Sequence, residues 1–432
     1  GIYPITPASP MAEKIDVMST NGEINFWGNK VKVVEMESEA GAIALVHGAL
    51  QSGILSSTFT ASQGLLLMIP TLYKLAGEML PAVINVAARS LSTHSLSIFG
   101  DHQDVYATRQ TGVCMLASSS VEEAYHMAAV AHLSSIKSSL PFIHFFDGFR
   151  TSHEINKIKE IDLSKVEALI DKKALQKFRE RAMNNTNPTT RGTAENDDIY
   201  FQNTEVRNQY YEDAITIVED YMNKINKITK EIIIAIGSVC QCIEETVDKL
   251  NDQGYKVGLV KVHLYRPFSV EKLLEVIPKT VQKVAVLDRT KEAGSSGEPL
   301  YLDVVNALKD TNIKVIGGRY GLSSKNTTPP MIKAVYDNLK KEMKNNFTIG
   351  ITDDVTNLSL DYDNNFKVNQ DSYQLLIYGY GSDGMISTSK DILKIIGDNT
   401  PKYVQGYFQY DSKKSGGVTR SHIRLSSSKI RS

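Results

Sequence analysis

Three polar residues of different chemistry, Thr6, Glu39 and Arg89, each follow a short run that is typical of a β-strand. A guanidinium group can donate two hydrogen bonds to one carboxylate, a hydroxyl group adds a neutral donor, and a carboxyl group can accept or give up a proton. Side chains of these three kinds suit a small anionic substrate that lies beside a cofactor. We therefore predict one site that contains all three residues.

Each of these residues also has a purely structural interpretation, which the residue types alone leave open. Glu39 begins a helix rich in Ala and Gly, where the helix dipole favours an acidic residue by about 0.3–1 kcal/mol. Thr6 could cap the helix that follows it, and Arg89 could form an ion pair with Asp101 or Asp104. The small residues after Glu39 would equally allow a flat cofactor to approach the backbone closely.

The surrounding sequence predicts the elements that would bring the three residues together. Up to about residue 146, short β-branched runs alternate with helical patterns, which is typical of a doubly wound α/β fold with a parallel sheet. The predicted strands are residues 2–5, 31–36, 54–61, 82–88, 112–117 and 141–146, and the predicted helices begin near residues 10, 39, 65, 101 and 121. Because the crossovers are right-handed, the carboxyl ends of the strands open on one edge, where ligands bind.

Two further polar segments follow predicted elements of this sheet. Residues 99–104 are expected to begin a helix that Asp101 caps, and a structural role for His102 is favoured over a catalytic one. Residues 147–154 follow the sixth strand. Their charges are expected to organise the exit into a helical connector rather than to reach the site.

The chain is long enough for three units. The first, residues 1–230, ends in the charged helical connector. Residues 231–370 are expected to form a smaller α/β domain, which opens with a buried strand in residues 232–238. Residues 371–432 begin a third α/β domain with a strand at 374–378.

In this third domain Gly379, Gly381 and Gly384 spell G-x-G-x-x-G between a strand and a helix. The arrangement can hold a pyrophosphate on backbone amides. A dinucleotide-binding fold also requires an acidic residue at the end of the next strand, but that strand supplies Gln405. The motif therefore favours phosphate binding over NAD binding.

The composition argues against several classes of protein. The 432 residues carry 48 Lys and Arg against 49 Asp and Glu, so no basic field attracts nucleic acid or a membrane surface. The three cysteines, Cys114, Cys240 and Cys242, fit neither a disulfide framework nor the ligand spacing of a zinc or iron–sulfur site. No apolar run is long enough to span a membrane. We expect a soluble fragment of a larger protein from a reducing compartment.

Several longer strings together resemble the amino-terminal portion of pyruvate:ferredoxin (flavodoxin) oxidoreductases. These strings are residues 3–7, 36–41, 58–65, 99–104, 147–154, 264–268, 287–292, 318–322 and 410–417. They extend over nearly the whole chain. The resemblance implies a thiamine diphosphate pyrimidine-binding domain, a transketolase-C-like domain II, and the start of a coenzyme A-associated domain.

The resemblance also implies roles for the three polar residues. In that family thiamine diphosphate lies between two α/β domains, and the first domain supplies a glutamate that hydrogen-bonds the aminopyrimidine ring. By this resemblance the catalytic and cofactor-binding glutamate is Glu39, which stabilises the imino tautomer that removes the thiazolium C2 proton. Thr6 and Arg89 resemble the residues that bind the pyruvate carboxylate.

For coenzyme A, the resemblance implies contacts at the glycine turn of the third domain. The matching positions are Gly381, Asp383, Gly384 and Lys390. Ser387 and Ser389 stand where the family pattern has a glycine and an asparagine.

The implied function is the decarboxylation of pyruvate on thiamine diphosphate, with formation of acetyl-coenzyme A and transfer of electrons through iron–sulfur clusters to ferredoxin or flavodoxin. Mg²⁺, the diphosphate and the clusters would be held by later domains, so the fragment alone is expected to be inactive. The complete enzyme is expected to be a homodimer in the cytoplasm or in the lumen of a hydrogenosome-like organelle. Two alternatives stay open: a pyruvate:NADP oxidoreductase with a fused flavin reductase module, and a non-catalytic scaffold paralogue.

Overall fold

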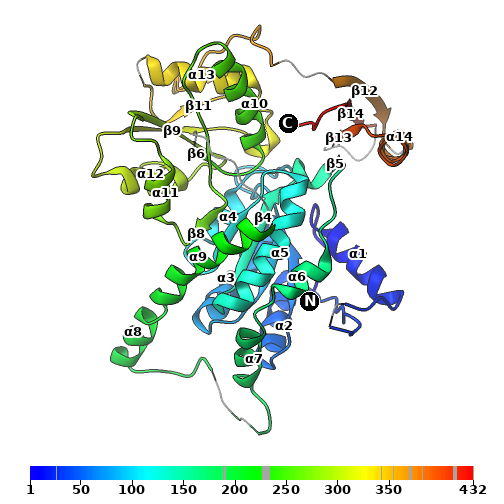
Figure 1. Ribbon diagram of the computed structural model, residues 1–432, viewed down its shortest axis with the longest axis vertical. Coiled ribbons are helices and arrows are strands. Elements are labelled where there is room, and N and C mark those ends of the chain that lie inside the picture. Colours follow the sequence, from blue (N-terminus) through cyan, green and yellow to red (C-terminus); the bar gives the residue numbers. More distant parts are fainter. Residues whose placement is uncertain are drawn as a thin grey trace.

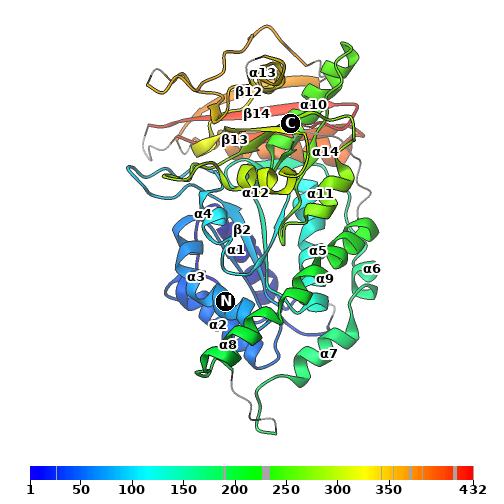
Figure 2. The same cartoon turned by 90° about the vertical axis from the view of Figure 1, so that its left-hand side faces the viewer.

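The computed structural model describes residues 1–25, 27–186, 188, 191–225, 234–341, 343–353, 355–368, 372–381, 383–411 and 416–431. Within these residues the chain forms three sheets that pack against helices (Figure 1). Figures 1 and 2 both show the second and third sheets at the same end of the molecule, beyond the first sheet. No helix in the described part of the chain has the length and apolar character needed to cross a membrane.

The first sheet is built mainly from parallel strands. Its strands, in order across the sheet, are β1 (Ser57–Thr60), β2 (Val83–Ala88), β4 (Phe142–Asp147), β3 (Cys114–Ala117) and β8 (Leu264–Arg266). The first four run parallel, and β8 joins the edge antiparallel to β3. Every residue of β2, β3 and β4 is buried, as the interior strands of a sheet covered on both faces must be.

Helices cover both faces of this sheet. The helices of the first unit are α1 (Ser9–Thr20), α2 (Glu39–Gln51), α3 (Ser62–Gly77), α4 (Gln103–Ala107), α5 (Val121–Ser138), α6 (Leu163–Ala168), α7 (Lys172–Glu180), α8 (Asp197–Glu205), which buries none of its residues, and α9 (Asn208–Ile225). On one face α2 and α3 pack against Ile84 and Val86 of β2. On the other, α5 and α9 pack against Val83 and Phe142, and Figure 2 shows these two helices side by side. The predicted α/β class with a parallel sheet is confirmed.

Two predicted strands of the first domain, residues 2–5 and 31–36, are wrong. The two segments meet at a single parallel bridge between Ile2 and Glu35 and lie outside the sheet. The second segment contains the charged, exposed side chains of Lys32 and Glu35. It therefore lacks the apolar surface that a strand covered on both faces must bury.

The second sheet is smaller and parallel. Its order is β11 (Phe347–Thr348), β10 (Lys314–Arg319), β9 (Lys283–Asp288), β6 (Ile234–Ala235) and β7 (Val260–Lys261). Its helices are α10 (Val239–Asp252), α11 (Val270–Val276), α12 (Pro299–Leu308) and α13 (Pro329–Lys340), with a 3-10 turn η2 (Leu322–Ser324). The first two residues of the predicted strand 232–238 lie outside the described residues.

The third sheet differs from the other two because its strands pair antiparallel. Its order is β12 (Ser372–Tyr380), β14 (Val418–Ser426), β13 (Tyr403–Gln409) and β5 (Glu154–Asn156). Helix α14 (Met385–Asn399) covers one face through Leu393. Strand β5, which follows the 3-10 turn η1 (Thr151–His153), comes from the segment after the first sheet, so it ties that segment to the third unit.

Candidate functional site

Thr6 and Arg89 lie together at the carboxyl edge of the first sheet. Arg89 follows β2 directly, and its Nη1 donates a hydrogen bond to the backbone carbonyl oxygen of Thr6 at 2.9 Å. Ala8, two residues after Thr6, packs against Ala87 near the end of β2 and Phe146 near the end of β4. The sequence prediction that these two residues meet at one edge therefore agrees with the geometry.

The guanidinium group of Arg89 is only partly satisfied by the protein. Its Nε atom is buried and has no hydrogen-bond partner among the described residues. Burial lowers the pKa of Arg89, and the charge of Asp104 opposes that effect. The sequence left open an ion pair between the Arg89 side chain and Asp101 or Asp104. Instead, Asp104 Oδ2 accepts from the backbone amide of Arg89 at 2.9 Å.

Glu39 is buried at the start of α2, beside the start of α3. The α2 N-cap is Ser38, whose Oγ accepts from Gly41 N at 3.1 Å, so Glu39 is not needed as the cap. A Cβ atom on Gly64 would lie 2.7 Å from Glu39 Oε1 and 2.7 Å from Thr60 Oγ1. The absence of a side chain at this position lets the Glu39 carboxyl group lie against α3. The nearby Thr60 hydroxyl is buried without a partner in the described part of the chain.

Asp104 connects these two parts of the site. Its buried carboxyl group accepts from the amides of Ser62 (2.8 Å) and Arg89 (2.9 Å), and also from Val105 N (2.7 Å). Burial raises the pKa of Asp104 to about 7, although the amide donors favour the charged form. Sequence reasoning treated Asp104 only as an ion-pair partner and missed this bridging position.

Asp101 and His102 connect the segment that carries Asp104 to the second unit. Asp101 Oδ1 accepts from Gln103 N, the first amide of α4, at 3.0 Å, but the N-cap residue of this helix is His102 rather than the predicted Asp101. Its Oδ2 accepts from Ser90 Oγ at 2.6 Å and from Ser323 N, in η2, at 3.2 Å. The favoured structural reading of His102 agrees with its burial and with its ion pair to Asp147.

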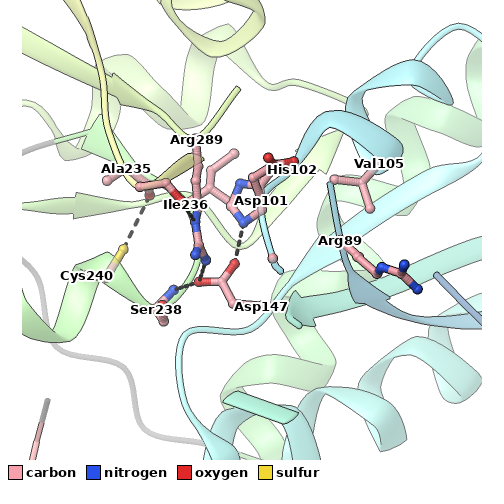
Figure 3. Close-up of polar contacts among 12 residues, drawn as sticks. Arg89, Asp101, His102, Val105, Asp147, Ala235, Ile236, Ser238, Cys240 and Arg289 are labelled. Carbon is pink, nitrogen blue, oxygen red and sulfur yellow. Dashed lines mark hydrogen bonds and ion pairs between the residues drawn. The ribbon is translucent and has the colours of Figure 1, made fainter. Parts of the chain in front are cut away.

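Asp147 lies at the centre of a buried polar cluster between the first and second units (Figure 3). Besides His102, it binds Arg289 Nη1 at 2.9 Å and the amide of Ser238 at 2.8 Å. Burial alone would raise its pKa, but the charges of Arg289 and His102 hold the pKa well below the ordinary range. The expectation that this residue organises the connector is therefore wrong, because its partners belong mainly to the second unit. Figure 3 also shows the Arg89 side chain pointing away from this cluster.

The glycine turn of the third unit is stabilised by its own aspartate. Gly381 and Gly384 have positive φ angles of 55° and 83°. Asp383 accepts from Tyr380 N at 2.7 Å and from Met385 N, at the start of α14, at 3.0 Å. These two amides are therefore occupied by a carboxylate and are not free to hold a phosphate. Ser382 lies outside the described residues.

Lys390 is exposed on α14, with its Nζ 5.6 Å from the centroid of the Phe408 ring. The roles assigned to this lysine and to the glycine turn stay predictions. The part of the chain that the structure describes contains no group of three or more His, Cys, Asp or Glu side chains that could hold a metal ion.

Comparison with known proteins gives three family matches along the chain. Residues 1–223 match the family model described as "Pyruvate flavodoxin/ferredoxin oxidoreductase, thiamine diP-bdg". Residues 229–332 match "Pyruvate:ferredoxin oxidoreductase core domain II", and residues 374–432 match "Pyruvate ferredoxin/flavodoxin oxidoreductase".

Among curated proteins, the chain is 52% identical over 450 aligned residues to a pyruvate:ferredoxin oxidoreductase of Moorella thermoacetica. It is 52% identical over 455 aligned residues to a probable pyruvate-flavodoxin oxidoreductase of Escherichia coli. Both alignments include 100% of this chain but only 38% and 39% of the relatives, so the chain spans about two fifths of their length. A solved 2-oxoglutarate:ferredoxin oxidoreductase of Magnetococcus marinus shares the fold with a TM-score of 0.54 and 17% identity, over 78% of this chain and 61% of that one.

Proposed function

Because the chain belongs to the pyruvate flavodoxin/ferredoxin oxidoreductase family, we propose that it forms the thiamine diphosphate pyrimidine-binding part of a pyruvate oxidoreductase. The complete protein would decarboxylate pyruvate, transfer the acetyl group to coenzyme A and pass electrons to ferredoxin or flavodoxin. The names of the relatives support pyruvate as the substrate and ferredoxin or flavodoxin as the electron acceptor. Since the chain spans about two fifths of those relatives, we assign Mg²⁺, the diphosphate contacts and the iron–sulfur clusters to parts outside it. We also propose that the complete enzyme is a homodimer, on the resemblance alone.

The single observation that carries the proposal is the position of the Glu39 carboxyl group. It is buried, and it lies against Gly64 and beside the Thr60 hydroxyl, which has no partner in the described residues. A carboxyl group and a free hydroxyl beside a small residue fit the polar edge of an aminopyrimidine ring. When bound, thiamine diphosphate supplies the carbon nucleophile and takes up the electrons that decarboxylation leaves.

In this arrangement Glu39 holds a proton at the pyrimidine ring nitrogen. Its burial excludes water from that hydrogen bond, which strengthens the bond because the local dielectric constant is low. Arg89 would bind the carboxylate of pyruvate through the terminal guanidinium nitrogens, one of which also contacts the Thr6 carbonyl oxygen, and the Thr6 hydroxyl would add a neutral donor. These residues would thereby orient the substrate toward the cofactor.

For coenzyme A, the residue types support a contact at Lys390 more directly than at the glycine turn. Lys390 is exposed and carries a positive charge suited to a phosphate group. In the turn, by contrast, Asp383 occupies the two amides that would otherwise attract one. We propose that Gly381, Asp383 and Gly384 shape this contact and that Lys390 supplies its charge.

The proposed function is tested by Glu39→Gln in the complete protein. Gln keeps the size of the side chain but cannot hold the proton, so kcat for pyruvate oxidation should fall by a factor on the order of 10²–10⁴. Glu37→Gln is the matched control, because Glu37 is exposed two residues earlier. Full activity in the Glu39 variant would exclude the proposed role and favour the scaffold alternative.

A further inference from the structure

Asp104 is a buried acid whose carboxyl group joins two separate backbone segments at the edge of the first sheet. A single oxygen, Oδ2, accepts from Ser62 N at 2.8 Å and from Arg89 N at 2.9 Å. Ser62 and Arg89 are far apart in sequence, at the start of α3 and at the end of β2. Within the described residues these contacts make Asp104 a direct link between the two elements.

The two backbone segments that Asp104 joins carry the two halves of the site. Arg89 contacts the carbonyl oxygen of Thr6, and α3 carries Gly64, against which the carboxyl group of Glu39 lies. A change in the spacing between these backbones would therefore change the spacing between the substrate-binding and cofactor-binding side chains.

The backbone at Ser62 also needs an external constraint. Ser62 has a φ angle of 53°, in the left-handed region that residues other than glycine rarely adopt. Such a conformation is strained and persists only where its surroundings fix it. Here Asp104 binds the Ser62 amide, and the Ser62 hydroxyl donates to the Ser90 carbonyl oxygen at 2.6 Å.

The segment that presents Asp104 is itself held from the second unit. The His102 amide donates to the Arg289 carbonyl oxygen at 3.0 Å. Ser323 N donates to Asp101 Oδ2, and Asp147 pairs with both His102 and Arg289. Asp104 is therefore a fixed point relative to both units.

We propose that Asp104 is a positioning residue, which holds Arg89 and the start of α3 at the spacing that pyruvate and the cofactor require. It acts through the Ser62 and Arg89 amides and contacts neither ligand. This inference rests on the proposed function for its kinetic consequence, but the backbone contacts themselves do not depend on it.

The kinetic test uses the complete enzyme with Asp104→Ala and Asp104→Asn. Ala removes the acceptor, so KM for pyruvate should rise about tenfold or more because Arg89 loses its position. Asn keeps one carbonyl oxygen for both amides, so its KM should stay within about threefold of the wild-type value. The KM for coenzyme A should change by less than about twofold in both variants, since no Asp104 contact reaches the third unit.

Asn338→Ala is the matched control. Asn338 is also buried, and its side chain binds the Lys344 backbone, accepting from the amide and donating to the carbonyl oxygen at 2.9 Å each, but it lies in α13 of the second unit. Its variant should lower thermal stability without raising KM for pyruvate. Equal changes in the two alanine variants, or a parallel rise in both KM values for Asp104→Ala, would overturn the proposal.

Hydrogen exchange of the complete protein separates this proposal from the proposed function. In Asp104→Ala, peptides containing Ser62 and Arg89 should exchange faster, whereas those containing Lys344 should not. Unchanged exchange at Ser62 and Arg89 would refute the positioning role whatever the activity. If the unsubstituted complete protein never turns over pyruvate, but Asp104→Ala exchanges faster at Ser62 and Arg89, the backbone role is supported and the proposed function is refuted. If Asp104→Ala does not fold, Asp104→Ser, whose shorter side chain cannot reach both amides, takes its place with the same expectations.

Discussion

At the scale of single residues, the site contains two of the polar atoms that the protein leaves unsatisfied. Arg89 Nε and Thr60 Oγ1 are buried and have no partner in the described part of the chain. A buried polar atom without a partner costs about 1–3 kcal/mol. A ligand that accepts from Arg89 and contacts Thr60 would remove this cost, so the two atoms support a ligand position between the end of β2 and the start of α3.

The role of Arg89 can be tested by a substitution that keeps its charge. Arg89→Lys removes the planar pair of donors, so KM for pyruvate in the complete enzyme should rise roughly 10- to 100-fold with a smaller change in kcat. Steady-state kinetics measures both values. Arg109→Lys is the control, because Arg109 binds Glu292 and none of the three proposed site residues. Its Nη2 donates to the two carboxyl oxygens of Glu292 at 3.0 and 2.9 Å. An unchanged KM in the Arg89 variant would exclude it from substrate binding.

Sequence reasoning placed Arg89 at the carboxyl edge of the first sheet because it follows the buried strand β2. For Thr6 and Glu39 the premise was wrong, because residues 2–5 and 31–36 are not strands of that sheet. Sequence reasoning could not find the roles of Asp104 and Asp147. A buried acid is recognised by what it binds, and these two bind backbone amides from distant segments, 91 residues away in the case of Asp147 and Ser238. Local residue patterns contain no signal for such contacts.

At the scale of elements, the start of α3 is the most tightly constrained part of the site. Gly64→Ala would place a Cβ atom 2.7 Å from Glu39 Oε1 and from Thr60 Oγ1. Glu39 would have to move, so affinity for thiamine diphosphate should fall about tenfold or more, as measured by titration of the cofactor-depleted complete enzyme.

The matched control for Gly64 is Gly48→Ala in α2, where nothing lies within 4 Å of the new Cβ atom. That variant should bind the cofactor normally and gain about 0.5–1 kcal/mol of stability, because Ala is the better helix former. Normal cofactor affinity in Gly64→Ala would show that the close approach of Glu39 to α3 does not matter for binding.

The elements that sequence reasoning predicted best are those with strong local patterns. The helix at Glu39 begins where it was expected, and the buried strands β2 and β4 lie within one residue of their predicted bounds. The errors concern how segments pair. Strand β8 joins the first sheet and β5 joins the third, although each lies in sequence outside the unit that it completes. Alternation of apolar residues predicts a strand but not its neighbour.

At the scale of the whole molecule, the first two units are joined by polar contacts as well as by strand β8, which the second unit adds to the first sheet. The buried cluster around Asp147 joins the end of β4 to Ser238 and Arg289. Nearer the surface, Asp303 of α12 binds Arg266 Nη2 of β8 at 2.9 Å. Both contacts are Arg–Asp ion pairs, but the Asp147 pair is buried and the Asp303 pair is partly exposed. Substitutions of the two aspartates can therefore separate their contributions to the coupling of the units.

We expect Asp147→Asn to weaken the docking of the second unit on the first. The substitution leaves the buried Arg289 charge without its counter-charge, and breaking a buried ion pair typically costs about 3–5 kcal/mol. Asp303→Asn should cost no more than about 1 kcal/mol, because its pair with Arg266 is partly exposed to water.

Trp27, the one tryptophan of this chain, reports on this coupling during chemical denaturation. It packs against the core of the first unit, whereas far-ultraviolet circular dichroism follows all units. In the unsubstituted chain the two signals should change together if docking couples the units. In Asp147→Asn the circular dichroism should show an earlier loss of the second unit, while the tryptophan signal changes later. Coincident transitions with an unchanged midpoint would contradict a coupling role for the cluster, and the two units would then be held together by strand β8 and by apolar packing.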